Sequence, residues 1–321
     1  MRCAILRYAK VLYSSMHGTI LCHTAFRLVA VCEREGRQVA TKHRPTLRSQ
    51  WLGQRLRELR EQNRKTLREI AEYLQRDPSS VSRMEAGIHP ARIPDVLAYL
   101  DFCGVSDDEQ RQALVQLAKE SRQSGWWDRY VDEHESLVDR IWLESHALQI
   151  DSFAAMVIPG HLQLRAYAEA TVRATDFETD SQIERLVDLR MQRQKRIQAQ
   201  ESLMVNVVLD EAVLHRRTGG NAVMRSQLLH LAELAGSGQM RIAVLPFEVP
   251  AHSSLDGSFD IMRLEAPYPT VGYVSTPAGA IFLEGDDVAQ LEKRFERLSE
   301  SALSPGRSAT KIKKLAIQFA E

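Results

Sequence analysis

Apolar residues recur at helical spacing between Thr66 and Gly87, and they predict two short helices joined by a tight turn. Thr66 and Glu69 have the spacing of a capping box, in which side chains satisfy the free backbone groups at a helix start. The apolar stripe of this first helix consists of Leu67, Ile70, Ala71 and Leu74.

The second helix is predicted to begin at Asp77-Pro78. Asp77 suits the N-cap, and Pro78 suits the first helical position because its missing N–H would be unpaired there. Val81 and Met84 give an inner face, and Gly87 suits the left-handed residue that often ends a helix. The outward positions are Ser79, Ser80, Ser82 and Arg83.

A short helix with this outer face fits the major groove of double-stranded DNA. Serines let the helix axis approach the base edges, and an arginine can donate two hydrogen bonds to guanine. The alternative is an ordinary helical hairpin whose outer face is only solvated. Spacing alone leaves both interpretations open.

Flanking patterns extend the pair to a five-helix, all-α head. A first helix carries Leu52, Leu56 and Leu59 inside, a fourth begins at Ile93-Pro94, and a fifth is capped by Ser106 or Asp107. We assign the head to residues 47–124. Residues 1–46 show no sustained period and are expected to be a poorly ordered extension, while residues 125–321 form the second domain.

In the second domain, apolar residues follow the spacing of a helix in some segments and that of a strand in others. Met204–Leu209 and Met240–Leu245 read as buried strands, and the amphipathic helix Ala222–Leu234 between them predicts a right-handed parallel crossover. The stretch Asp139–Phe153 is compatible with a helix or a strand. Antiparallel strands are predicted at Ser258–Leu264, Val271–Ser275 and Ala280–Leu283, and closing helices at Val288–Leu303 and Ser308–Phe319. The expected fold is an α+β multidomain chain whose C-terminal mixed α/β domain has a roughly five-stranded sheet and flanking helices.

Charge is balanced over the 321 residues but is unevenly distributed. Between Lys42 and Arg92 there are 12 basic and 6 acidic residues, as expected of a DNA-binding head. The alternative to a DNA-binding head is an ordinary solvated helical surface that carries many charged side chains. The four cysteines lack metal-ligand spacing, and the apolar run 19–31 is too short to span a bilayer. We therefore expect no metal, no membrane role and a reducing, cytoplasmic compartment.

Five residues of the second domain are candidates for catalysis: Asp210, Glu211, His215, His252 and Asp256. Carboxylates at a strand end can act in an active site, but a turn that caps the next helix explains them more simply. The chain has no glycine-rich phosphate loop and no hydrolase or metalloprotease motif. We therefore expect no catalytic residues and no cofactor.

The segment from Arg55 to Gly87 resembles the DNA-binding domain of XRE-type regulators, the phage-repressor-like helix-turn-helix family. The resemblance implies that Ser79 and Arg83 reach base edges and that Ser80 touches phosphate. Pro78 occupies a position that often carries a base-contacting side chain in relatives. Specificity is therefore expected to depend on Ser79, Ser82 and Arg83.

The same resemblance implies three structural positions in the head. Ala71 matches the small residue where the two helices cross, and Glu85 matches a glutamate that pairs with an arginine of the first helix, here Arg60. Gln75 replaces the glycine that is usual in the turn, so a positive φ there would cost roughly 1 kcal/mol.

The second domain resembles the domain that follows an XRE-type head in WhiJ-like bacterial regulators, which has often been labelled as of unknown function. The resemblance implies an antitoxin-like regulator that acts with a small BldB-like protein partner. It is carried by the segments 158–170, 207–235, 242–262 and 279–288, which occur in the same order as in those regulators.

Together these patterns predict a DNA-binding transcriptional regulator that docks as a homodimer on a two-fold symmetric operator. Phosphate contacts are expected from Arg55, Arg64, Lys65 and Arg68. The alternative is a ligand-binding or enzymatic α/β domain whose helical head mediates protein contacts.

Overall fold

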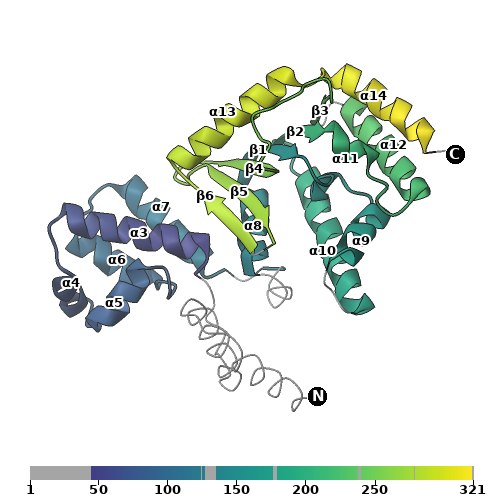
Figure 1. Cartoon of the computed structure of the whole chain (residues 1–321). Helices are drawn as coiled ribbons and strands as arrows, with labels where there is room; N and C mark the ends of the chain where they lie inside the picture. Colours follow the sequence, from purple (N-terminus) through teal and green to yellow (C-terminus); the bar gives the residue numbers. More distant parts are fainter. Residues whose placement is uncertain are drawn as a thin grey trace, which may run out of the picture. The chain divides into compact units, whose positions relative to one another are not determined.

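The computed structural model describes residues 45–123, 125–126, 135–175, 179–237, 240–277 and 279–319 (Figure 1). The expected extension 1–46 lies outside this range except for Pro45 and Thr46. Among the described residues, no helix is long and apolar enough to cross a membrane.

Residues 47–121 form five helices, as the sequence predicts. Their apolar stripes face one another, and Leu56, Ile70 and Val96 are fully buried between them. The helices are α3 (Leu47–Gln62), α4 (Leu67–Tyr73), α5 (Pro78–Glu85), α6 (Ile93–Phe102) and α7 (Asp108–Ser121).

The C-terminal region is built on one six-stranded mixed sheet with the order β3-β2-β1-β4-β5-β6. Strands β1, β2 and β3 run parallel, while β4, β5 and β6 continue the sheet in antiparallel pairs on the other side of β1. The strands are β1 (Ala147–Ala154), β2 (Met204–Asp210), β3 (Arg241–Leu245), β4 (Phe259–Leu264), β5 (Val271–Thr276) and β6 (Gly279–Leu283).

The predicted parallel pairing is confirmed: β2 pairs with β3, and α12 (Asn221–Ser237) lies between them in the chain. The five predicted strands are also present, and the sheet, predicted to have roughly five strands, has six. The sixth is β1, which lies in the middle of the sheet and follows directly on helix α8 (Glu135–His146). The stretch Asp139–Phe153, predicted as a helix or a strand, therefore contains parts of both. The buried polar residues Asp151 and Ser152 of β1 interrupt the apolar run that would otherwise mark an interior strand.

Helices cover both faces of the sheet (Figure 1). On one face, α13 (Asp286–Ser301) packs its apolar side against Phe153, Val208 and Phe259. On the other, α12 and α14 (Pro305–Gln318) pack together and against β3. The remaining helical elements are η2 (Gly160–Leu162), α9 (Arg165–Arg173), α10 (Asp180–Gln198) and α11 (Glu211–His215).

The edge strand β3 is sealed by the segment that leads into α14. The Val244 N–H donates to Ser308 Oγ at 2.9 Å, and the Val244 carbonyl accepts from the Leu303 N–H at 2.8 Å. Ser308 is fully buried. The Val244 N–H and carbonyl, which an edge strand would otherwise offer to another strand, are therefore already bonded.

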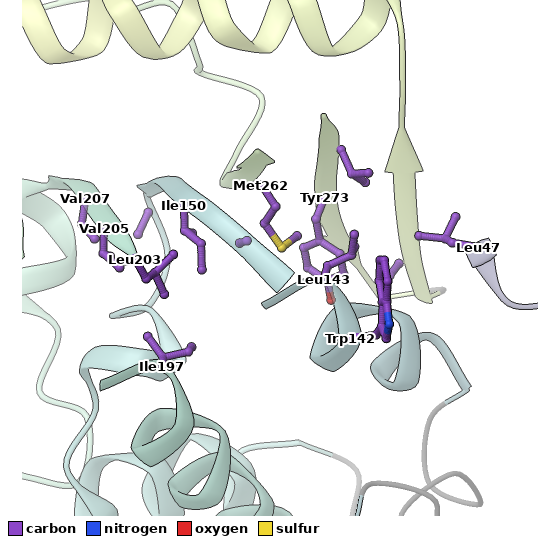
Figure 2. Packing of buried hydrophobic residues seen from close by; sticks show 14 of the residues in the cluster. Leu47, Trp142, Leu143, Ile150, Ile197, Leu203, Val205, Val207, Met262 and Tyr273 are labelled. Carbon is purple, nitrogen blue, oxygen red and sulfur yellow. The ribbon is translucent and has the colours of Figure 1, made fainter. Parts of the chain in front are cut away.

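A single apolar core continues from the N-terminal helices into the sheet. Figure 2 shows Leu47, at the start of α3, near Trp142 of α8 and in the same cluster as Ile150 and Met262. The rings of Trp51, Trp142 and Tyr268 pack with centroids 5.2–6.0 Å apart. The helical region is thus joined to the sheet by packed aromatic side chains as well as by the chain.

Candidate nucleic-acid interface

Helix α4 begins with the predicted capping box. The Thr66 hydroxyl accepts from the Glu69 N–H, and the Glu69 carboxylate accepts from the Thr66 N–H at 2.7 Å. These bonds lower the pKa of Glu69 below its usual value. The short helix therefore starts at a defined residue although it has only seven residues.

The turn after α4 has the strained residue that the sequence implies. Gln75 has φ = 52°, and the flanking N–H groups of Gln75 and Arg76 bond back to the carbonyls of Glu72 and Ala71. This is the Schellman pattern, which normally takes glycine at its left-handed position. Helix α3 ends in the same way with Arg64 at φ = 55°.

Helix α5 buries one narrow face and exposes the rest. Val81 and Met84 are buried, whereas Ser79, Ser82 and Arg83 are exposed. Ser80 is half-buried. Asp77 occupies the N-cap position, but its side chain makes no capping hydrogen bond, contrary to the simplest expectation. The side chains of Ser79, Ser82 and Arg83 are therefore accessible on the surface of the head.

Helix α3 crosses α5 at Gly53. A Cβ atom at this position would lie 2.4 Å from the Glu85 carbonyl oxygen and 2.6 Å from that of Met84. Gly87 has φ = 70°, and a Cβ there would meet the backbone of Gln50 at 2.7 Å. Two glycines therefore let the C-terminal end of α5 lie directly against the backbone of α3.

An ion pair fixes the same end of α5. Arg60 Nε and Nη2 donate to the two Glu85 carboxylate oxygens at 2.8 and 2.9 Å, and the Tyr99 hydroxyl donates to Oε1 at 2.7 Å. The bonds to Glu85 raise the pKa of Arg60, and burial together with the bond to Glu85 raises the pKa of Tyr99. Three helices, α3, α5 and α6, thus meet at one buried carboxylate.

Ala71 is 1% exposed and lies on the inner face of α4, which packs on α5. A side chain this small permits the close packing of two short helices. The three residues assigned structural positions therefore lie in the interior of the head, while those expected at bases lie outside.

The four residues expected at phosphates differ in their surroundings. Arg55 already pairs with Glu58 at 2.9 Å on the same helix, although its side chain remains 65% exposed. The Lys65 ammonium lies 5.1 Å from the centre of the Phe102 ring. Arg64 and Arg68 are exposed and, within the described residues, have no carboxylate partner.

A small pocket beside α5 gathers basic residues that the sequence pattern did not single out. It has a volume of about 310 Å³ and is bordered by Ser80. Arg92 N-caps α6 without a side-chain capping bond, and Arg76 is paired with Asp95 at 3.2 Å. Because Arg76 and Arg92 lie close to α5 in the sequence, their presence in this pocket could have been predicted. The presence of Arg122 could not, because it comes from the end of α7. The basic lining residues are Arg76, His89, Arg92 and Arg122.

Charge is partitioned within the head. Residues 45–92 carry ten basic and six acidic side chains, whereas residues 93–123 carry three basic and six acidic ones. The positive excess therefore belongs to α3, α4, α5 and the segment after α5, while α6 and α7 are acidic. This agrees with the basic excess that the sequence shows between Lys42 and Arg92.

The candidate catalytic residues of the C-terminal region are bonded to their neighbours. Asp210 caps α11 by accepting from the Ala212 N–H at 2.8 Å, and its other oxygen lies 3.6 Å from His252 Nε2. Glu211 is bonded to Lys311 at 2.6 Å and accepts from the Phe247 N–H.

The remaining two candidates are also paired. His215 lies 3.4 Å from Glu211, and the exposed Asp256 is paired with Arg294 at 2.7 Å. The structure therefore brings Asp210 and His252 together and leaves Asp256 in a separate ion pair. Across the part of the chain that is described, no group of three or more metal-ligating side chains could hold a metal ion.

Comparison with protein families gives two matches. A helix-turn-helix domain matches residues 51–114, which covers α3 to α6 and the start of α7. A domain of unknown function, DUF5753, matches residues 137–314, from α8 into α14. Searches among curated proteins and among solved structures gave no match.

Proposed function

This chain belongs to the DUF5753 family and carries a helix-turn-helix domain ahead of the family's domain, and from this premise we propose that it is a sequence-specific DNA-binding transcriptional regulator. The observation that carries this function is the outer face of α5. Ser79, Ser82 and Arg83 are exposed there, on a helix held in place by Gly53 and by the Arg60–Glu85 pair.

Base recognition is assigned to Ser79, Ser82 and Arg83. An exposed guanidinium can donate two parallel hydrogen bonds to guanine O6 and N7, and hydroxyl groups can accept from or donate to base edges. Rigid support matters because base recognition requires the helix to enter the groove in one orientation. The buried carboxylate of Glu85 supplies that support from three helices.

Phosphate binding is assigned to the exposed or partly exposed cations around this helix. Arg64, Lys65 and Arg68 precede or begin α4, Arg55 lies on α3, and Ser80 borders the basic pocket. Arg92 and Arg122 extend this set, since a phosphate oxygen beside Ser80 would lie in that pocket. Contacts of this kind position a protein on the duplex without reading its sequence.

The finer parts of this function rest on resemblance. We infer an XRE-type head that binds as a homodimer to two-fold symmetric half-sites, one or more helical turns apart. The C-terminal domain would make the chain a WhiJ-like, antitoxin-like regulator controlled by a small BldB-like protein or a ligand. We assign it no catalytic step, a view supported by the local bonds of Asp210, Glu211 and Asp256.

The test is selection of bound sequences from random duplex DNA by the full-length protein, followed by affinity measurements at several salt concentrations. Arg83→Ala should weaken binding to the selected site by ~1–3 kcal/mol and relax preference at one base pair. Arg68→Ala should weaken binding to all sequences similarly and reduce the salt dependence.

Arg297→Ala is the matched control, because Arg297 is an exposed arginine on α13 in the C-terminal region. It should leave both the selected sequence and the affinity unchanged. Absence of salt-sensitive DNA binding by the wild-type protein would refute the proposed function. If Arg83→Ala lost the same affinity on every DNA sequence, Arg83 would contact only phosphate.

A further inference from the structure

A long groove lies on the side of the head formed by α3 and α7. It has a volume of about 1310 Å³ and also includes the segment 266–269 and Glu284 of the C-terminal region. Its lining therefore comes from both family-matched parts of the chain. Pockets that form where two parts of a protein meet are frequent ligand sites.

One end of the groove contains a carboxylate with aromatic neighbours. The Trp51 indole Nε1–H donates to Glu284 Oε1 at 2.6 Å, and the Tyr268 ring lies 6.0 Å from the Trp51 ring. Both aromatic residues line the groove together with Glu284. Among the residues that the structure describes, no lysine, arginine or histidine lies within ion-pair distance of Glu284.

Glu284 differs in this respect from three other sheltered carboxylates of the chain, although buried Glu120 is likewise bonded to Tyr268 and Gln116 and not to a cation in the described residues. Glu85 has Arg60, Glu144 has Arg193, and Asp260 has Arg140. A partly buried carboxylate gains most from a cation that satisfies its remaining oxygen, since solvent screening is reduced there.

The rest of the groove has an acidic rim and an apolar floor. Its basic lining residues are Arg55, Arg111 and Lys119. Arg55 is paired with Glu58 and Arg111 with Asp101, and within the described residues none of the three is paired with Glu284. The floor includes the buried side chains of Leu59, Leu114 and Leu117. Its acidic lining residues are Glu58, Asp107, Asp108, Glu109 and Glu284.

We propose that this groove binds a small organic cation: an ammonium group at Glu284, against the face of Tyr268, with an apolar body lying along the floor. The carboxylate supplies the charge partner, and the aromatic ring attracts a cation through its π-electrons. This inference builds on the proposed DNA-binding function, because a ligand that contacts α3, α7 and Tyr268 together is placed to influence the head.

The test is a calorimetric titration of the full-length protein, without DNA, using three probes of one shape: phenethylammonium, 2-phenylethanol and phenylacetate. Saturable one-to-one binding is expected for the cation only. Glu284→Gln should weaken it about tenfold, the loss of one charge-assisted contact. Because the glutamine oxygen can still accept from Trp51, this variant is expected to fold, and circular dichroism at matched temperature checks it.

Glu265→Gln is the control, since Glu265 is exposed and does not line the groove. It should bind phenethylammonium like the wild type. Equal binding of 2-phenylethanol or phenylacetate, absence of saturable binding, or an unchanged affinity in Glu284→Gln would overturn the assignment. Glu284-dependent binding of a lysine-rich peptide but not of the amine would overturn it in favour of a protein partner. None of these outcomes depends on DNA binding, so the two functions fail separately.

Discussion

At the scale of single residues, His161 is the buried group most sensitive to acid. It is 5% exposed, and its Nε2 atom has no hydrogen-bond partner within the described residues. Burial lowers its pKa to about 4. The nearby carboxylates of Asp260 and Glu144 raise this pKa, and the nearby cations Arg140 and Arg193 lower it. The folded protein therefore holds a neutral imidazole at neutral pH.

Acid should therefore destabilise the fold through His161. The unfolded chain binds a proton near pH 6.5, whereas the folded chain binds it only near pH 4. The stabilising contribution is complete above pH 6.5 and is lost as pH falls towards 4, by about 3 kcal/mol in total. Chemical denaturation at pH 7 and pH 5 should show a smaller loss of unfolding free energy in His161→Gln than in the wild type. Equal losses in the two proteins would contradict the prediction.

Gln75 offers a second test at this scale. Its φ of 52° is a left-handed conformation that glycine adopts without steric cost. Gln75→Gly should therefore raise the free energy of unfolding by up to about 1 kcal/mol, because relief of strain exceeds the entropy gained by the unfolded chain. Urea denaturation measures this change. A destabilised variant would mean that the Gln75 side chain makes a contribution larger than its strain.

At the scale of elements, the crossing of α3 and α5 depends on the absence of a side chain at Gly53. A Cβ atom there would lie 2.4 Å from a backbone oxygen, which cannot rotate away. Gly53→Ala should cost about 3 kcal/mol and displace α5, so both stability and DNA affinity should fall. Thermal unfolding and DNA titration measure the two effects.

Gly306 provides the matched substitution. It lies in α14, where an added Cβ would meet nothing within 4 Å. Gly306→Ala should leave DNA affinity unchanged and raise stability by up to about 1 kcal/mol, since alanine favours a helix. If both alanine variants behaved alike, close backbone contact at Gly53 would not be what positions α5.

The elements also show what a sequence can and cannot predict here. The pair α4 and α5 was predictable because their apolar spacing, capping box and Gly87 are all local signals. Strand β1 was predictable only as one of two alternatives, because Asp151 is polar and buried through bonds to Asn206 and Arg263, far along the chain. A local pattern cannot reveal partners that only the folded sheet supplies.

The same limit applies to the sites. Exposure of Ser79, Ser82 and Arg83 followed from helical periodicity. The contribution of Arg122 to the pocket beside Ser80 did not, because α7 reaches that pocket only in the folded head. Nor could spacing reveal that Trp51 bonds to Glu284, since 233 residues separate them.

At the scale of the whole molecule, the shared core predicts cooperative unfolding. Leu47, Trp51 and Trp142 belong to one buried cluster with strands β1 to β3. The described chain should therefore unfold in one calorimetric transition, observed alike by tryptophan fluorescence and circular dichroism. Trp51→Ala should lower stability by about 3–5 kcal/mol and separate a head transition from that of the sheet. Two transitions in the wild type would contradict this.

The division of charge inside the head has a kinetic consequence. A duplex approaching α6 and α7 meets carboxylates, while one approaching α3 to α5 meets the positive excess. The head therefore has an electric dipole that turns it during diffusion, so that collisions occur preferentially with the serine-bearing helix towards the phosphates. Added salt shortens the range of this torque. The association rate constant for DNA should consequently fall as ionic strength rises, in addition to the weakening of the bound complex by salt.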